Sequence, residues 1–335
     1  MNVKALNVFV LCLGVAAVQA SLLGVAGEYN IFSFGDVIVK WSDSEGKVAG
    51  QGDVNVESYR IGAQSDPSLH SLVGGGDVTF KYGEIHNGGI YAGGGTKLTG
   101  ATVHGDIHVG QNLDVFSGGT YDGNFVVNGT ADVPGYLSHK VNYGDPGDVP
   151  VDFSAAYTNV SNLSHSLASQ ATSGSIEKNG NAVTLKGNDL YNYFHLTSQD
   201  VSNLSSLTLD LGEGAVAYIN VSGTKNSLGD FDLFDGEGDV FTNSESLLFN
   251  FYQADYLTLA QAGIRGSILA MDADVDFNNA YADGNVVVGS ISGYGEFHSG
   301  FFRSPQDVPE PEVLAFLGVG GTMFLGFIAG KRKTE

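Results

Sequence analysis

Short stretches of alternating apolar and polar residues, separated by glycine-containing turns, recur at a nearly constant spacing between residues 74 and 133. The apolar residues that precede three of these turns are 18 positions apart. This period is too short for a propeller blade and fits one coil of a β-solenoid, in which alternate side chains point inward and stack on those of neighbouring coils. The expected stacks are Ile85, Val103 and Tyr121 in one, and Ile90, Ile107 and Phe125 in the other.

A similar unit returns far downstream, where residues 283–289 nearly repeat residues 122–128. If this unit stacks beside the first set, the order of the coils in space differs from their order in the chain. The same alternation also fits a β-sandwich built from hairpins, which is the alternative architecture. The sequence therefore predicts a mainly β protein, with a β-solenoid favoured over a sandwich.

One stretch lacks both glycine and the two-residue alternation, and it predicts a long amphipathic helix at about 152–171. Asp152 or Ser154 is placed to cap its start, and Gly174 follows its end. Because it is the single helix of this kind, we expect it to pack lengthwise along the solenoid. The apolar residues of its expected inner face recur at steps of three and four: Phe153, Tyr157, Val160, Leu163 and Leu167.

Both ends of the chain carry signals for export. Lys4 precedes an apolar stretch at residues 8–18, and small residues before Ser21 predict signal-peptide cleavage between Ala20 and Ser21. At the other end, an uncharged run of 18 residues from 313 to 330 is followed by a short basic stop. As a helix this run would measure about 27 Å, enough to cross a thin bilayer. The predicted organisation is a signal peptide at 1–20, one domain at 21–303, a linker at 304–311 and a membrane-spanning anchor segment at 312–333.

The linker contains Pro309, Glu310 and Pro311 directly before the apolar run. This arrangement resembles the PEP-CTERM sorting signal of Gram-negative bacteria. The resemblance implies an exosortase-type processing enzyme as a partner, an inner-membrane-anchored precursor, and release to the outer surface or an exopolysaccharide-rich matrix. An ordinary single-pass anchor that stays in the membrane is the alternative.

Composition narrows the function further. The chain has a formal net charge of −22, and such an acidic protein repels phosphate backbones, so no nucleic-acid partner is expected. The single cysteine, Cys12, lies in the signal peptide, so no disulfide is expected in the exported part. The 48 glycines follow no collagen-like period, and they are interleaved with 42% hydrophobic residues, which favours many short strands joined by tight turns over disorder.

An ordered set of segments resembles the bacterial choice-of-anchor A domain, an adhesin-like domain found with different anchors, PEP-CTERM tails included. The resemblance spans roughly residues 29 to 302 and implies a β-rich adhesive fold, with neither catalytic residues nor a named ligand. The segments that carry it are 29–36, 42–49, 50–54, 73–77, 150–153, 248–251, 266–270, 285–289 and 296–298.

Two groups of residues suggest metal binding. His104 and His108 flank Asp106, and His86 aligns with His104 one coil earlier, but no third ligand stands at a fixed spacing, so an exposed ladder of side chains is favoured. The second group alternates carboxylates in one apparent strand and predicts a weak calcium site: Asp272, Asp274 and Asp276. No other cofactor is expected.

We therefore expect an exported, non-enzymatic, adhesin-like protein that associates with exopolysaccharide or biofilm material through Tyr and Asn side chains on a broad face. Two alternatives remain open. A polysaccharide-acting enzyme would need paired carboxylates in a cleft. An ice-binding solenoid would need a regular flat array of small hydroxyl residues, and the threonines are irregularly placed for one: Thr96, Thr99, Thr102 and Thr120.

Overall fold

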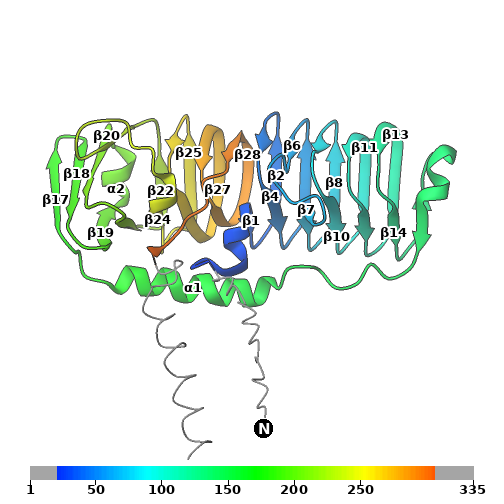
Figure 1. Ribbon diagram of the computed structural model, residues 1–335, viewed down its shortest axis with the longest axis horizontal. Coiled ribbons are helices and arrows are strands. Elements are labelled where there is room, and N and C mark those ends of the chain that lie inside the picture. Colours follow the sequence, from blue (N-terminus) through cyan, green and yellow to red (C-terminus); the bar gives the residue numbers. More distant parts are fainter. Residues whose placement is uncertain (1–20, 306–335) are drawn as a thin grey trace, which may run out of the picture. The chain divides into compact units, whose positions relative to one another are not determined.

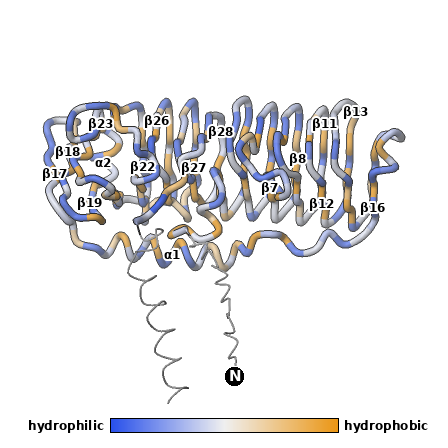
Figure 2. Tube along the Cα trace, viewed as in Figure 1, coloured by the Kyte–Doolittle hydropathy of each residue, from blue (hydrophilic) through white to orange (hydrophobic). Residues whose placement is uncertain are grey.

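The computed structural model describes residues 21–305, apart from the side chain of residue 117, and these residues form one unit built around stacked parallel strands. The chain turns through three faces in each coil, and equivalent strands of successive coils pair in parallel throughout the larger sheet (Figure 1). The predicted solenoid is therefore confirmed, and the sandwich of antiparallel hairpins is excluded. In Figure 2 hydrophobic and hydrophilic residues alternate along the strands, as expected when every second side chain enters the core.

The first face is built from the strands β1 (Tyr29–Ser33), β4 (Lys47–Gly50), β7 (His70–Gly74), β10 (Gly89–Ala92), β12 (Ile107–Val109), β14 (Phe125–Val127), β16 (Val141–Tyr143), β19 (Tyr191–Thr197), β21 (Val216–Ser222) and β24 (Leu247–Asn250). The second face contains β2 (Val37–Lys40), β5 (Val54–Glu57), β8 (Val78–Lys81), β15 (Ala131–Asp132), β22 (Lys225–Leu228) and β25 (Tyr256–Ala260). The third contains β3 (Asp43–Ser44), β6 (Arg60–Ile61), β9 (Glu84–Ile85) and β26 (Gly263–Ile264).

Four strands bend around corners and belong to more than one face. They are β11 (Thr96–Val103), β13 (Leu113–Tyr121), β27 (Ser267–Asp283) and β28 (Val286–His298). A separate four-stranded sheet covers one end of the solenoid (Figure 1). Its strands are β17 (Ser175–Asn179), β18 (Ala182–Gly187), β20 (Ser206–Leu211) and β23 (Asp232–Asp235).

Both predicted inward stacks are observed. Val103 pairs with Ile85 on one side and with Tyr121 on the other, and Ile107 lies in register between Ile90 and Phe125. All six side chains are buried in one continuous hydrophobic core inside the coils. The 18-residue period therefore reports the length of one coil in this part of the chain.

The order of the coils in space differs from their order in the chain, as the repeated downstream unit suggested. Strand β28 pairs with β27 on one side and with β1 on the other, which places Val286 in register with Ile31. The coils from the carboxyl-terminal half thus join those from the amino-terminal half through one seam. Figure 1 shows β28 between β27 and the first strands of the chain.

Helix α1 (Phe153–Ser169) lies within the predicted range and runs lengthwise along the first face (Figure 1). Asp152 caps its start by accepting a hydrogen bond from the Ala155 backbone N–H at 2.9 Å. Phe153, Val160 and Leu167 are buried with outward side chains of the first face in a second hydrophobic cluster. The other helical segments are short: η1 (Gly24–Glu28), η2 (Gly135–Lys140), α2 (Ser198–Ser202) and η3 (Ser244–Ser246).

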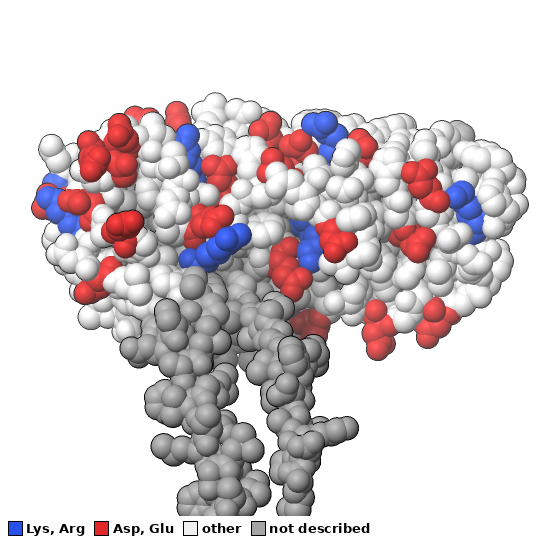
Figure 3. All heavy atoms as spheres, viewed as in Figure 1, with Lys and Arg blue, Asp and Glu red and all other residues white. Residues whose placement is uncertain are grey.

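Aspartates tie successive coils together at the corner between the first and second faces. The Asp36 carboxylate accepts the backbone N–H of Asp53, and the Asp53 carboxylate accepts that of Asp77, each at 2.8 Å. Asp77 continues the ladder to Gly95 at 2.7 Å. Acidic side chains outnumber basic ones on the side of the molecule drawn in Figure 3. Part of the acidic composition is structural, because the carboxylates of this ladder satisfy backbone donors that the tight corner leaves without a strand partner.

No helix between residues 21 and 305 has the length and apolar character needed to cross a membrane. The predicted span at 312–333 lies outside the described residues.

Candidate functional site

The corner between the second and third faces has a backbone conformation that repeats from coil to coil. Trp41, Ser58, Tyr82 and Gly100 occupy this corner in successive coils, and each has a φ between 52° and 60°. Left-handed conformations cost a residue with a Cβ roughly 1 kcal/mol or more, so aromatic residues here are unusual. The conformation turns their side chains away from the core and into solvent.

A groove of about 710 Å³ opens along this corner and over the adjoining part of the third face. We call it the corner groove. The residues that line it come from the coils of β2, β5, β8 and β11 and from β28: Trp41, Ser42, Asp43, Ser58, Tyr59, Arg60, Tyr82, Gly83, Glu84, Gly100, Thr102 and Glu296.

Two aromatic side chains flank the middle of the groove. Trp41 is 61% exposed and Tyr82 is 63% exposed. Trp41 lies against Tyr294 of the preceding coil, with 6.3 Å between ring centroids, and the Lys40 ammonium lies 4.4 Å from the centre of the Trp41 ring. The Tyr82 ring lies over Gly100, where an added Cβ would come within 2.9 Å of it. Trp41 therefore packs toward β28 and Tyr82 packs toward β11. Ser58 belongs to the coil between those of the two aromatic residues.

A row of charged side chains forms the third-face side of the groove. Arg60 lies in register between Asp43 and Glu84, and its guanidinium is 3.0 Å from the Asp43 carboxylate. Glu296 and Thr102 extend the row in the neighbouring coils. The row thus combines three carboxylates with one guanidinium, so the groove carries excess negative charge.

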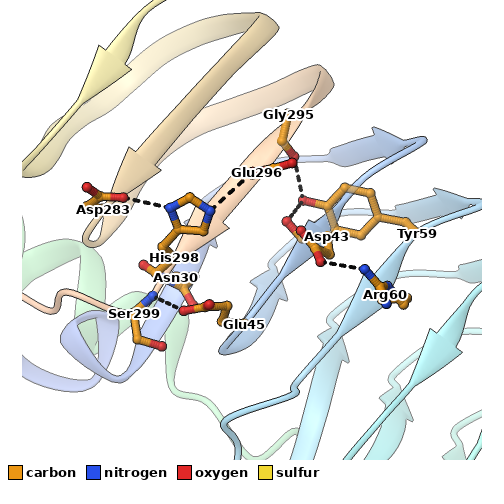
Figure 4. Close-up of polar contacts among 10 residues, drawn as sticks. All are labelled: Asn30, Asp43, Glu45, Tyr59, Arg60, Asp283, Gly295, Glu296, His298 and Ser299. Carbon is orange, nitrogen blue, oxygen red and sulfur yellow. Dashed lines mark hydrogen bonds and ion pairs between the residues drawn. The ribbon is translucent and has the colours of Figure 1, made fainter.

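Tyr59 fixes the backbone beneath this row. Its hydroxyl lies 2.7 Å from the Asp43 carbonyl oxygen and 3.1 Å from that of Gly295 (Figure 4). Burial, reinforced by the charges of Asp43 and Glu296, holds the pKa of Tyr59 well above its usual value. Tyr59 therefore stays a neutral donor, and it fastens β3 to β28 where the two halves of the solenoid meet.

Histidines lie beside two of the groove carboxylates. His104 Nε2 is 3.4 Å from Glu84, and its Nδ1 is 2.6 Å from Asp122. The hydrogen bond to Asp122 raises the pKa of His104. His298 bridges Asp283 and Glu296 (Figure 4). Its partial burial lowers its pKa, but the hydrogen bonds to both carboxylates and the charges of Asp283 and Glu45 raise the pKa overall. Protonation of either imidazole would therefore offset negative charge at the groove.

The predicted histidine ladder is split between two faces. His86 and His104 are neighbours on the third face, with ring centroids 6.3 Å apart. His108 lies on the first face instead, 4.7 Å from His70 and close to Tyr91. The two histidines that flank Asp106 in the sequence therefore point to different sides of the coil.

The three aspartates of the predicted calcium site have separate hydrogen-bond partners. Asp272 accepts a hydrogen bond from the Tyr157 hydroxyl of α1 at 2.8 Å, and Asp274 accepts one from Ser290 at 2.6 Å. Asp276 accepts one from the amide of Asn278 at 2.6 Å. Among residues 21–305, no group of three or more His, Cys, Asp or Glu side chains is arranged to hold a metal ion. Calcium binding stays a prediction, and thermal melts with calcium and with a chelator would test it.

The predicted sorting motif Pro309, Glu310 and Pro311 lies outside the described residues, as does Ala20 of the predicted cleavage site. Ser21 begins the described chain, and its carbonyl accepts the Gly24 backbone N–H at 2.7 Å. At the other end, the Ser304 hydroxyl lies 3.3 Å from that of Tyr218, which belongs to the cluster beneath α1. Both ends of the described chain therefore lie at the first face, away from the corner groove.

Sequence reasoning proposed a broad polar face and did not single out Trp41 or Tyr82. The sequence repeat gave little indication of these two residues, because the connection between their coils is longer than the repeat. Val48 pairs with Leu72, 24 positions further along the chain, instead of about 18. The repeat therefore could not be extended back to Trp41 from the sequence.

Comparisons with known proteins add a family assignment. Residues 22–299 match the model of a family described as "Putative Ice-binding-like adhesive domain". A solved ice-binding protein from an Antarctic Flavobacteriaceae bacterium is similar at 12% identity and a TM-score of 0.30, over 85% of this chain and 99% of that chain. No curated protein matches the sequence significantly.

Proposed function

Because the chain belongs to the ice-binding-like adhesive domain family, we propose that it is an exported, non-enzymatic adhesive protein that holds extracellular polysaccharide. The observation that carries this proposal is the corner groove, where two exposed aromatic rings stand above a polar floor.

The residue types of the groove suit a sugar chain. A sugar ring has an apolar C–H face that stacks on aromatic rings, and hydroxyl groups around its edge that need hydrogen-bond partners. Trp41 and Tyr82 offer the rings. The hydroxyls of Ser58 and Thr102 and the carboxylates of Glu84 and Glu296 offer acceptors, and bonds to carboxylates are the stronger kind.

Retention of the full chain on the producer's own exopolysaccharide tests this function. We expect Trp41→Ala and Tyr82→Ala each to lower the retained fraction at least about fivefold, because each removes one stacking surface. Tyr143→Ala is the matched control, since Tyr143 is 69% exposed on β16, away from the groove. Unchanged retention in both groove variants would refute the proposed role.

Polysaccharide cleavage is the enzymatic alternative to simple adhesion. Incubation with the same polysaccharide distinguishes them, because a glycosidase releases new reducing ends and an adhesive protein does not. We expect no release, and release that is lost in Glu84→Gln or Glu296→Gln would establish an enzyme instead.

The tail motif supports a proposal about location. We propose that Pro309, Glu310 and Pro311 direct an exosortase-type enzyme to process the exported chain and release it to the surface or matrix. Mass spectrometry of the secreted protein would find a carboxyl terminus near this motif. Replacing Glu310 with Ala should leave the unprocessed chain in the membrane fraction, whereas unchanged secretion would favour a different route.

Ice binding is the second candidate, favoured by the description of the family. An outward row of the second face runs through Ile38, Asn55, Thr79, Lys97 and Asp114 in register. Such a mixture lacks the repeated small hydroxyl groups that an ice-binding array needs. We expect no thermal hysteresis, and a measurable freezing-point gap would revive this function.

A further inference from the structure

Resting on the proposed function, we infer that the corner groove takes sugar chains that are neutral or carry amino groups, and that it rejects chains of uronic acids. The charges along the third-face side of the groove carry this inference. Of the four charged side chains in this row, only Arg60 is positive, and it is already engaged by Asp43 at 3.0 Å. Glu84 and Glu296 lie in the coils on either side of that pair.

Among the described residues that line the groove, no lysine or second arginine compensates these two carboxylates. The groups that contact them are histidines: His86 and His104 at Glu84, and His298 at Glu296. Lys40 lies over the Trp41 ring at the rim and does not line the groove. While these imidazoles are neutral, a ligand carboxylate therefore meets like charge on the third-face side, whereas an ammonium group finds partners there. Like charges brought together at an interface cost several kcal/mol, enough to exclude a ligand.

The spacing of the aromatic rings sets the length of the ligand. Trp41 and Tyr82 belong to coils two steps apart, and neighbouring strands are about 4.8 Å apart, so their backbones are separated by roughly 10 Å. One sugar ring cannot stack on both side chains at that separation. The groove therefore favours an oligosaccharide that lies across several coils over a monosaccharide.

Three hexasaccharides test the inference with the full chain: one of glucose, one of glucosamine and one of galacturonic acid. Isothermal titration at low salt should give the tightest binding for glucosamine and weaker binding for glucose. Binding of galacturonic acid should be at least about tenfold weaker than that of glucose. Monomeric glucose should bind more weakly than its hexamer. Raised salt should narrow the difference between the charged ligands, because it screens exposed charges.

The double variant Glu84→Gln with Glu296→Gln tests the contribution of charge, since glutamine keeps the shape of the side chain and one acceptor oxygen but carries no charge. We expect it to retain glucose binding and to lose most of the discrimination between glucosamine and galacturonic acid. Trp41→Ala should weaken the binding of glucose and glucosamine at least about fivefold, and Tyr143→Ala should leave both unchanged. Circular dichroism would confirm that each variant is folded.

The outcomes separate this inference from the function on which it rests. Binding of galacturonic acid as tight as that of glucose, and sensitive to Trp41→Ala, would leave the proposed function standing and overturn the inference. Discrimination that persists in the double glutamine variant would also overturn it. Failure of all three hexasaccharides to bind would overturn both.

Discussion

The residues other than glycine that adopt positive φ between positions 21 and 305 all lie at one corner of the solenoid: Trp41, Ser58, Tyr82, Gln261 and Asn279. The hydrogen-bond ladder continues through this corner, as in the bond from the Trp41 N–H to the Glu57 carbonyl at 3.0 Å. The neighbouring coils therefore impose the left-handed conformation on whichever residue stands there. Glycine would adopt this conformation at lower cost, so the aromatic residues at this corner make the fold less stable than glycine would.

This strain predicts a difference between two truncations of Trp41. Trp41→Gly and Trp41→Ala both remove the ring, but only alanine keeps the Cβ that disfavours φ of 60°. The glycine variant should be more stable than the alanine variant by about 1 kcal/mol in urea unfolding. Both should lose polysaccharide retention. Equal stability of the two variants would show that this corner is not strained.

The acid sensitivity of the fold should depend in part on His70. Partial burial and the neighbouring His108 lower the pKa of His70 to about 4, against a weaker opposing effect of Asp106. Between pH 6.5 and about 4, His70 binds a proton in the unfolded chain but not in the folded chain. The free energy of unfolding therefore falls as the pH falls through this window. Because His70 is partly exposed, the loss should be on the order of 1 kcal/mol.

Melting temperatures of wild type and His70→Gln across this window provide the measurement. The variant should lose less stability between pH 7 and about 4.5, since glutamine does not titrate. His139→Gln serves as the control, because His139 is exposed in η2. Parallel pH profiles for wild type and His70→Gln would contradict the prediction.

The site was less predictable from the sequence than the fold, for a reason visible at these residues. The sequence rule places glycine at sharp corners, and Gly100 obeys it, but Trp41 and Tyr82 stand at the same corner against the rule. Trp41 and Tyr82 are recognised as corner residues only by their register with the neighbouring coils, and that register is known only once the strands are paired. The local sequence pattern therefore predicted the coils, but it did not predict which side chains project into solvent at their corners.

At the scale of elements, helix α1 was predicted because its apolar face depends only on local spacing. Its docking also relies on a buried polar network that local spacing does not reveal. The Ser164 hydroxyl donates to Asn250 at 2.7 Å, and the Asn250 amide donates to the Ser164 carbonyl at 2.9 Å and to Asn220 at 2.8 Å. Asn220 in turn donates to the Leu167 carbonyl at 2.9 Å. Two asparagines of adjacent coils thus hold the last turns of the helix.

Replacing Asn250 with alanine should lower the free energy of unfolding by about 2–4 kcal/mol, because it leaves Ser164 and Asn220 buried without this partner. Asp152→Ala, which removes only the helix cap, should cost about 1 kcal/mol. Urea unfolding of both variants gives the comparison. An Asn250→Ala variant no less stable than Asp152→Ala would mean that apolar packing alone docks the helix.

At the scale of the whole molecule, the seam at β28 decides how the solenoid holds together. The pairing of Val286 with Ile31 joins segments from opposite ends of the domain. The sequence suggested this arrangement through the repeated unit at 283–289, but it could not say where the unit inserts. Strands so distant in the chain produce no local sequence period where they pair, so the position of the seam is known only from the strand pairings of the structure.

The seam predicts that a break in the chain between the two halves will not separate them. Gly144 lies between β16 and α1 in an exposed connection, and an added side chain there would meet no atom within 4 Å. A protease site inserted after Gly144 should therefore be cleaved in the folded protein. The two fragments should stay together, because β28 pairs with β1, β2 and β3 and α1 remains docked on the first face. Size-exclusion chromatography should show one peak at the uncut position, which resolves into two fragments only in denaturant. Separation under native conditions would show that the halves are independent units and that the pairing of β28 with β1 does not hold the domain together.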